Sequence, residues 1–117
     1  MARSFLESAL AGAMPTFAAE WELQRRGYPP GTEPSTTDFL DALRAHVVAL
    51  LAAGRVAETT RLFYAIERLL GEADPVLEQL LTRDFLARLA SDCQASRIDS
   101  RRVVAYLGPR SRRAWES

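Results

Sequence analysis

The segment RVAETTRLFYAIERLLG (55–71) and, two residues further on, DPVLEQLLTRDFLARLA (74–90) decide the fold. Apolar residues in the first segment recur at spacings of one, three and four, which places them on one side of an α-helix. The second segment opens with Asp74 at an N-cap position and Pro75 at the first helical position, where the fixed φ of proline favours the helix. Gly71 is expected to supply the left-handed residue that ends the first helix. Two helices joined this closely are antiparallel neighbours with facing apolar sides, so the stretch predicts a helical hairpin.

The same helical periodicity continues on both sides of the hairpin. It predicts further helices over residues 5–14, 16–26, 37–53 and 100–107, and a last turn over 109–115. The segment GYPPGTEPST (27–36) holds three prolines and two glycines, a density that predicts a surface loop. No alternating run is long enough to indicate a sheet. Residues 1–117 are therefore expected to form a single all-α domain, a bundle of five or six helices.

Charge is distributed unevenly along a chain whose net charge is zero. Residues 1–93 carry nine arginines against thirteen acidic residues, a net charge of −4, whereas residues 94–117 carry six arginines against two acidic residues, a net charge of +4. Lysine does not occur. Arginine suits bidentate pairing with carboxylates, so the arginine-rich C-terminal segment (97–117) is expected to pair with the acidic body.

Several classes of protein are disfavoured by the composition. Cys93 and His46 are the only cysteine and the only histidine, which leaves no intrachain disulfide and no zinc site of the usual kind. The longest apolar run, 47–53, is too short to span a bilayer, and Glu7 interrupts the N-terminal run before a signal-peptide core forms. We find no phosphate-binding glycine loop, nucleophile elbow or metal-ligand cluster. The chain is expected to be cytoplasmic, not an enzyme, and to need neither cofactor nor metal.

Three polar residues on apolar helix faces have two interpretations each. His46 is either a general base with a carboxylate partner from another helix or, as we favour, a hydrogen-bonded structural imidazole. Asp84 is expected to pair with Arg88 four residues later; the alternative is that this side is a docking surface and the core is made by other residues. Glu67 is either a rim residue or the partner of an arginine across the hairpin.

The C-terminal arginines raise the possibility of contacts with nucleic-acid phosphates. Only two aromatic residues, Tyr106 and Trp115, lie among them, and the acidic body repels a polyanion. A nucleic-acid-binding regulator is therefore kept as the alternative function. Its candidate contacts are Arg101, Arg102, Arg110, Arg112 and Arg113.

Two parts of the chain are recognisable together: Ile66–Glu67 in the hairpin, and the ending LGPRSRRAW (107–115). Together with the motif D-P-x-L (74–77) and the pair F-L (85–86) between them, they resemble a widespread family of small bacterial proteins without assigned activity. The resemblance covers roughly residues 15–115 and is weak residue by residue. The family tends to carry an acidic residue where this chain has Ala87, so any role of that acid is lost here. The ending is open to a structural or a functional interpretation.

Members of that family often occur as immunity-type proteins beside polymorphic or contact-delivered toxins. The resemblance thus implies a non-catalytic protein that binds a cognate protein toxin and covers its working surface. Many toxins that attack nucleic acids are basic around their sites, so an acidic helical surface is expected to bind them through electrostatic steering. The candidate contacts are Glu20, Glu22, Asp38, Asp41, Glu58, Glu67, Glu72 and Asp84. The sequence leaves open which of them share a face, and a structural or self-associating module remains a third possibility.

Overall fold

A computed structural model describes the backbone of residues 2–116, with side chains from residue 5 onward. Its helices are α1 (Ala2–Ala13), α2 (Pro15–Arg26), α3 (Thr36–Ala53), α4 (Val56–Glu72), α5 (Pro75–Gln79), the π-helix η1 (Leu80–Ala87), α6 (Arg88–Ala95), α7 (Ser100–Val104) and α8 (Pro109–Glu116). The described residues contain no strand, which confirms the all-α prediction. Because α5, η1 and α6 follow one another without a break, they form one rod, and the described chain has seven helical units where five or six were expected.

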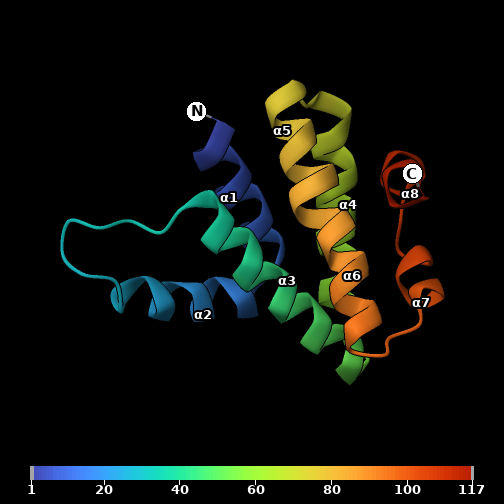
Figure 1. Ribbon diagram of the computed structural model, residues 1–117, viewed down its shortest axis with the longest axis horizontal. Helices are drawn as coiled ribbons and strands as arrows, with labels where there is room; N and C mark the ends of the chain where they lie inside the picture. The colour runs from blue at the N-terminus through green and yellow to red at the C-terminus, as the bar shows by residue number, and fades with distance from the viewer. Residues whose placement is uncertain (1, 117) are drawn as a thin grey trace.

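The predicted hairpin lies at the centre of the molecule (Figure 1). Helix α4 runs antiparallel to the α5–η1–α6 rod, and Asp74 caps the rod by accepting a hydrogen bond of 2.8 Å from the backbone N–H of Leu77. Both partners contribute fully buried side chains to one core, including Phe63 and Ile66 from α4 and Phe85 from η1. Burial of each such side chain contributes about 2 kcal/mol to stability.

Gly71 does not end α4, so the prediction of a left-handed residue there is wrong. The helix continues to Glu72 and ends at Ala73, which is extended at φ −72°. A Cβ atom on Gly71 would lie 3.3 Å from the guanidinium carbon of Arg110. The glycine leaves room for the guanidinium of Arg110 beside α4 and does not form a turn.

The second half of the hairpin extends beyond Ala90, where the periodic pattern ended, to Ala95. Its middle is a π-helix of eight residues, in which each N–H bonds the carbonyl five residues earlier. Cys93 is buried in the extension, and the chain turns at Arg97, whose φ is +58°. A pattern based on 3.6 residues per turn cannot reveal a segment wound to a different period.

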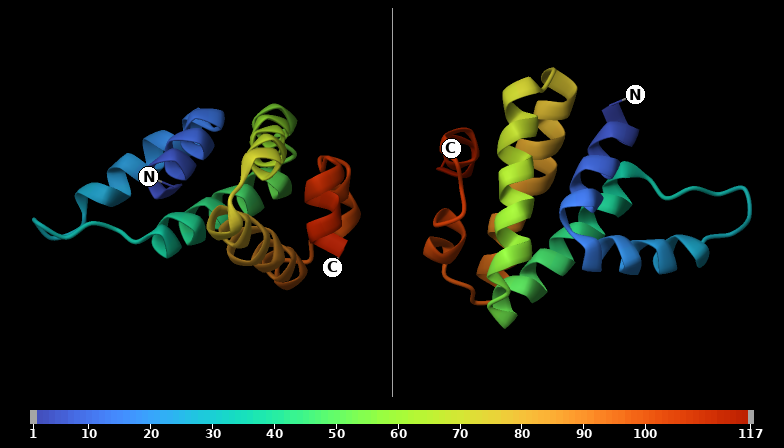
Figure 2. Two further views of the ribbon diagram at one scale, coloured as in Figure 1. Left: turned by 90° about the horizontal axis from the view of Figure 1, so that it is seen from above. Right: turned by 180° about the vertical axis from the view of Figure 1, so that it is seen from behind.

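Two further helices flank the rod on opposite sides (Figures 1 and 2). Helix α3 packs against η1 and α6 on one side, and α8 packs against η1 and α4 on the other. Helices α1 and α2 cover α3 and α4 at one end, and residues 27–35 form a loop that reaches beyond them. The rod therefore has two seams, one with α3 and one with α8.

None of the helices within residues 2–116 is long and apolar enough to cross a bilayer.

Candidate functional site

A buried carboxylate attaches α8 to the hairpin. Glu67 projects from α4 with 16 % of its side chain exposed. One carboxylate oxygen accepts hydrogen bonds from the backbone N–H (3.1 Å) and the guanidinium (3.3 Å) of Arg110; the other accepts from the backbone N–H and the hydroxyl of Ser111, both at 3.0 Å. These donors lie at the start of α8, where backbone N–H groups have no helical partner. Glu67 is thus the N-terminal cap of a helix more than forty residues later in the chain.

The turn before α8 is shaped around this carboxylate. A Cβ atom on Gly108 would lie 2.6 Å from the carboxyl carbon of Glu67, closer than such atoms can approach. Burial raises the pKa of Glu67, but the hydrogen bonds from Ser111 and Arg110 outweigh it, so the pKa lies below the ordinary 4.5 and the group is ionised at neutral pH. We name Glu67, Gly108, Arg110 and Ser111 the clasp. It joins Ile66–Glu67 to the LGPRSRRAW ending, which supports the structural interpretation of that ending.

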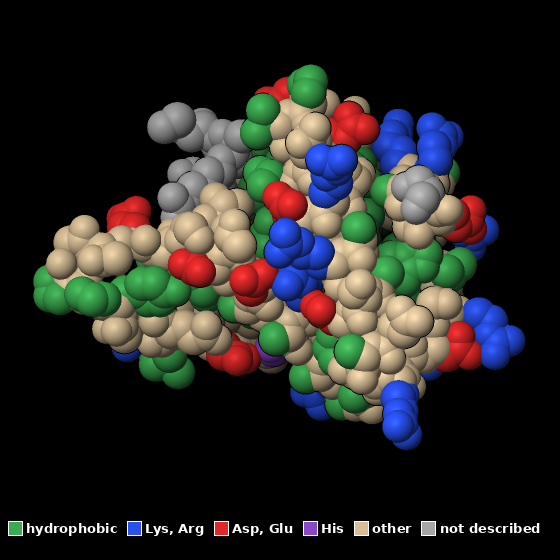
Figure 3. Space-filling view, viewed as in Figure 1, with side chains coloured by type: hydrophobic (Ala, Val, Ile, Leu, Met, Phe, Trp, Pro, Cys, Tyr) green, Lys and Arg blue, Asp and Glu red, His purple; other side chains and the backbone are tan. Residues whose placement is uncertain are grey.

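A buried arginine occupies the other side of the rod. Arg44, on α3, has 11 % of its side chain exposed. It forms ion pairs of 2.8 Å with Asp41 and with Asp92 of α6, and donates a hydrogen bond of 3.1 Å to the backbone carbonyl of Asp84 in η1. We name Asp41, Asp84 and Asp92 around Arg44 the acidic seam. Acidic and basic side chains are interspersed over the face that contains it (Figure 3).

The predicted ion pair between Asp84 and Arg88 is absent from the described structure. Both side chains nevertheless line the same hollow beside α3, together with Asp41. Phe85, Leu86 and Leu89 are fully buried. Leu77 and Leu81, on the same side of the predicted helix as Asp84, are buried in the core as well. Neither interpretation therefore holds in full: that side belongs to the core, and Asp84 lies partly exposed at its edge without the predicted ion pair.

His46 connects three helices. Its Nδ1 lies 3.0 Å from a carboxylate oxygen of Glu20 on α2, and its Nε2 lies 3.0 Å from the hydroxyl of Thr16. Thr16 in turn donates a hydrogen bond of 2.5 Å to Glu58 on α4. The ring packs against Phe17, with 5.5 Å between the ring centroids.

The order hydroxyl, imidazole, carboxylate resembles a nucleophile with its base and orienting acid. Here, however, the hydrogen of the Thr16 hydroxyl points to Glu58 and not to the ring, so His46 does not accept it. This arrangement suits a linker between helices, and within the described residues every buried side-chain nitrogen and oxygen has a hydrogen-bond partner.

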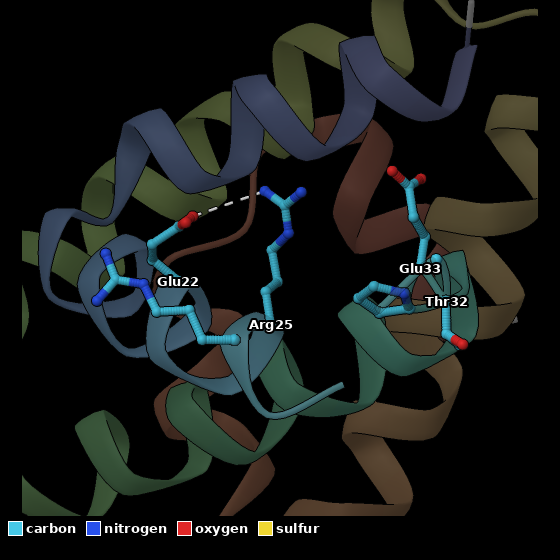
Figure 4. Close-up of a pocket in the computed structure, with 7 residues that line it drawn as sticks. Glu22, Arg25, Thr32 and Glu33 are labelled. Carbon is cyan, nitrogen blue, oxygen red and sulfur yellow. Dashed lines mark ion pairs between the residues drawn. The ribbon is translucent and has the colours of Figure 1, made fainter. Parts of the chain in front are cut away.

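The remaining acidic candidates are separate from the acidic seam. Glu22 forms an ion pair of 3.6 Å with Arg25 beside an open cleft of about 480 Å³ under the loop, with Thr32 and Glu33 opposite (Figure 4). Asp38 forms the capping box of α3 with Ser35, and Glu72 is exposed at the end of α4. The structure therefore brings together Asp41 with Asp84, and Glu20 with Glu58, but not all eight. The sequence analysis did not single out four residues of these sites, because each meets a partner on a helix far away in the sequence. They are Arg44, Asp92, Thr16 and Ser111.

Three of the five candidate arginines have partners within the chain. Arg101 pairs with Asp99 at 2.7 Å, Arg102 donates to the carbonyl of Leu51, and Arg110 belongs to the clasp. Arg112 and Arg113 are exposed and form no ion pair within residues 2–116. Much of the basic end is thus engaged by the protein itself.

The fold and these contacts define a small all-α bundle in which partly buried Arg44 joins α3 to the rod and partly buried Glu67 joins α8 to α4. No group of three or more potential metal-ligand side chains occurs in the described part of the chain. A family model, the domain of unknown function DUF7674, matches residues 8–117, and the chain belongs to this family. Comparisons with curated proteins and with solved structures find no match.

Proposed function

We propose that this protein is a non-catalytic, cytoplasmic binding protein of the immunity type, which neutralises a cognate protein toxin by covering the toxin's working surface. The observation that carries the proposal is the acidic seam. Two of its members, Asp41 and Asp84, belong to the acidic residues that the sequence singled out, and the structure adds Asp92.

Rigid placement makes this seam suitable for protein recognition. Arg44 holds Asp41 and Asp92 by ion pairs of 2.8 Å, yet half of the Asp41 side chain stays exposed. Three carboxylates stand against the two guanidinium groups of Arg44 and Arg88, so the seam with Arg88 carries a net charge of −1. Acidic groups fixed on helices steer a basic partner into position and lose little entropy on binding.

The test is co-expression with the product of the adjacent open reading frame. The wild-type protein is expected to restore growth and to co-purify with that product. The double variant Asp41→Asn/Asp84→Asn keeps Asp92 for Arg44, so it is expected to fold but to bind at least about tenfold more weakly.

The matched control is Glu22→Gln/Glu72→Gln, which removes the same charge from exposed positions outside the seam. It is expected to retain binding and rescue. Equal loss in both double variants would place the interface elsewhere. Absence of both rescue and complex with the wild-type protein would refute the proposed function, and DNA retention that falls when Arg112 and Arg113 become alanine would favour the nucleic-acid regulator instead.

A further inference from the structure

The second seam of the rod, between η1 and α8, contains a groove. Two hollows of about 400 and 360 Å³ lie along it and share Thr82 and Ala114, so they are continuous. Small side chains, Ala87 and Ala90, line the groove on the rod side, and Trp115 lines it on the α8 side. The groove is open because alanines face the place where larger side chains would close the contact between the helices.

The charges at this groove are basic and available. Arg83 lines one hollow and Arg113 the other, both are exposed, and neither forms an ion pair within residues 2–116. Arg110 also lines the groove, but the clasp partly neutralises it. Glu78 is the acidic residue among those that line the two hollows. Two unpaired guanidinium groups therefore flank an alanine-lined surface.

We propose that the η1–α8 groove is a docking site for an acidic peptide segment of a protein partner. Guanidinium groups bind carboxylates through paired, charge-assisted hydrogen bonds, and an alanine floor accepts aliphatic side chains between the acidic ones. Trp115 adds one rigid aromatic contact of the kind that anchors interfaces.

Charge and shape favour a peptide over a nucleic acid. Single-stranded nucleic acid is held by successive bases stacked on several aromatic side chains, whereas the groove offers Trp115 alone among its lining residues. A long polyanion would also meet the acidic body, with its net charge of −4 over residues 1–93, while a short acidic segment need meet only the groove. The proposal is independent of toxin binding at the acidic seam, which lies on the opposite side of the rod.

The probe is a fluorescein-labelled peptide of alternating glutamate and leucine, titrated with the full-length protein and followed by fluorescence anisotropy. The controls are the same peptide with glutamine for glutamate, and a labelled oligothymidylate of equal length. We expect salt-sensitive binding of the glutamate peptide, and binding at least about tenfold weaker for each control.

Protein variants test the location. Arg83→Ala/Arg113→Ala is expected to weaken binding of the glutamate peptide by about tenfold or more. Arg26→Ala, an exposed and unpaired arginine at the far end of the molecule, is expected to leave binding unchanged. Ala87→Trp fills the groove at an exposed position without changing the charge, and is expected to block binding as well.

The two tryptophans report where the peptide binds. Trp115 lines the groove, whereas Trp21 is 6 % exposed and packs between Phe17 and Phe39. In ¹H–¹⁵N spectra the indole signal of Trp115, assigned with Trp115→Phe, is expected to shift on titration while that of Trp21 stays in place. Absence of peptide binding, equal binding of the glutamine peptide, tighter binding of oligothymidylate, or loss of binding in Arg26→Ala would each overturn the proposal.

Discussion

The two helices that flank the rod are attached on the same plan with the charges exchanged. Helix α3 is held to the rod by the partly buried guanidinium of Arg44, which has three acceptors, and its partner Asp41 is half exposed. Helix α8 is held to α4 by the partly buried carboxylate of Glu67, which has four donors, and its partner Arg110 is exposed.

In both contacts a charge that is partly removed from water is matched by several partners, and the ionised partners stay partly exposed to solvent. Each flanking helix is therefore held by a structural anchor whose charged partners reach the surface. Neighbouring residues of η1 contribute to both seams, since Arg83 lines the groove and Asp84 lies in the acidic seam.

The largest effect is expected at Gly108. Gly108→Ala places a Cβ atom 2.6 Å from the carboxyl carbon of Glu67 and should displace the cap of α8, lowering the free energy of unfolding by about 3 kcal/mol. The backbone at this residue has no positive φ, so the clash is the cause of the loss.

Chemical denaturation followed by circular dichroism measures the change at Gly108. In a Glu67→Ala background the same substitution should cost much less, because the group it strikes is gone. If Gly108→Ala lowered the free energy of unfolding equally in the wild type and in Glu67→Ala, the close contact between Gly108 and Glu67 would not be the cause of the loss.

Substitution of Arg44, which holds α3 to the rod, is expected to lower the free energy of unfolding by a smaller amount. Arg44→Met keeps the aliphatic volume but leaves Asp92 and the carbonyl of Asp84 without their donor, for a loss of about 2 kcal/mol. Arg88→Met, which removes an exposed charge beside the seam, should change stability by less than about 0.5 kcal/mol.

Cys93 provides a local readout for Arg44→Met. This thiol is 1 % exposed on α6, one residue from Asp92, and burial raises its pKa. Loosening of α6 from α3 should accelerate labelling of Cys93 under native conditions, and an unchanged labelling rate would show that Arg44 does not hold α6.

The next smaller effect is a dependence of the free energy of unfolding on pH, which we expect from Glu67 at the contact between α4 and α8. The pKa of Glu67 is lowered in the folded state, so the unfolded state binds the proton more readily at acid pH. Its stabilising contribution is complete above the ordinary pKa of about 4.5 and is lost as the pH falls through the lower folded value.

Comparison with Glu67→Gln isolates this contribution. The variant should be less stable than the wild type by about 1–2 kcal/mol at neutral pH, because an amide cannot accept all four donors. The difference should narrow as the pH falls below 4.5 in denaturation curves recorded across the acid range. If the difference in free energy of unfolding between the wild type and Glu67→Gln did not change with pH, the ionised form of Glu67 would not be the source of the stability of the clasp.

The smallest effect is expected at Asp84, whose backbone and not its side chain holds Arg44. Its carboxylate takes part in no hydrogen bond or ion pair within the described residues. Asp84→Asn should therefore alter thermal stability by less than about 0.5 kcal/mol, whereas Asp92→Asn should cost about 1 kcal/mol. Equal losses would mean that the two carboxylates support the seam alike.

Much of the architecture follows directly from the chain. The periodic apolar residues of the hairpin, the cap at Asp74 and the proline-rich loop determine that the protein is helical and roughly where each helix lies, because these signals act within a few residues. The sequence favoured His46 as a hydrogen-bonded imidazole without naming its partners. It left Glu67 either at the rim or paired with an arginine across the hairpin, whereas the arginine that Glu67 meets, Arg110, lies on α8.

Tertiary structure alone decided how the charges are used. Glu67 meets Ser111, and Arg44 meets Asp92, only when helices more than forty residues apart come together, and no local spacing encodes such a meeting. Arg83 and Asp84 are neighbours on η1, yet Arg83 lines the groove beside α8 and Asp84 the hollow beside α3, because the rod packs between these two helices. Local propensity therefore determined the helices, whereas packing across the rod determined which surface is acidic, which is basic, and which charged groups remain free to bind.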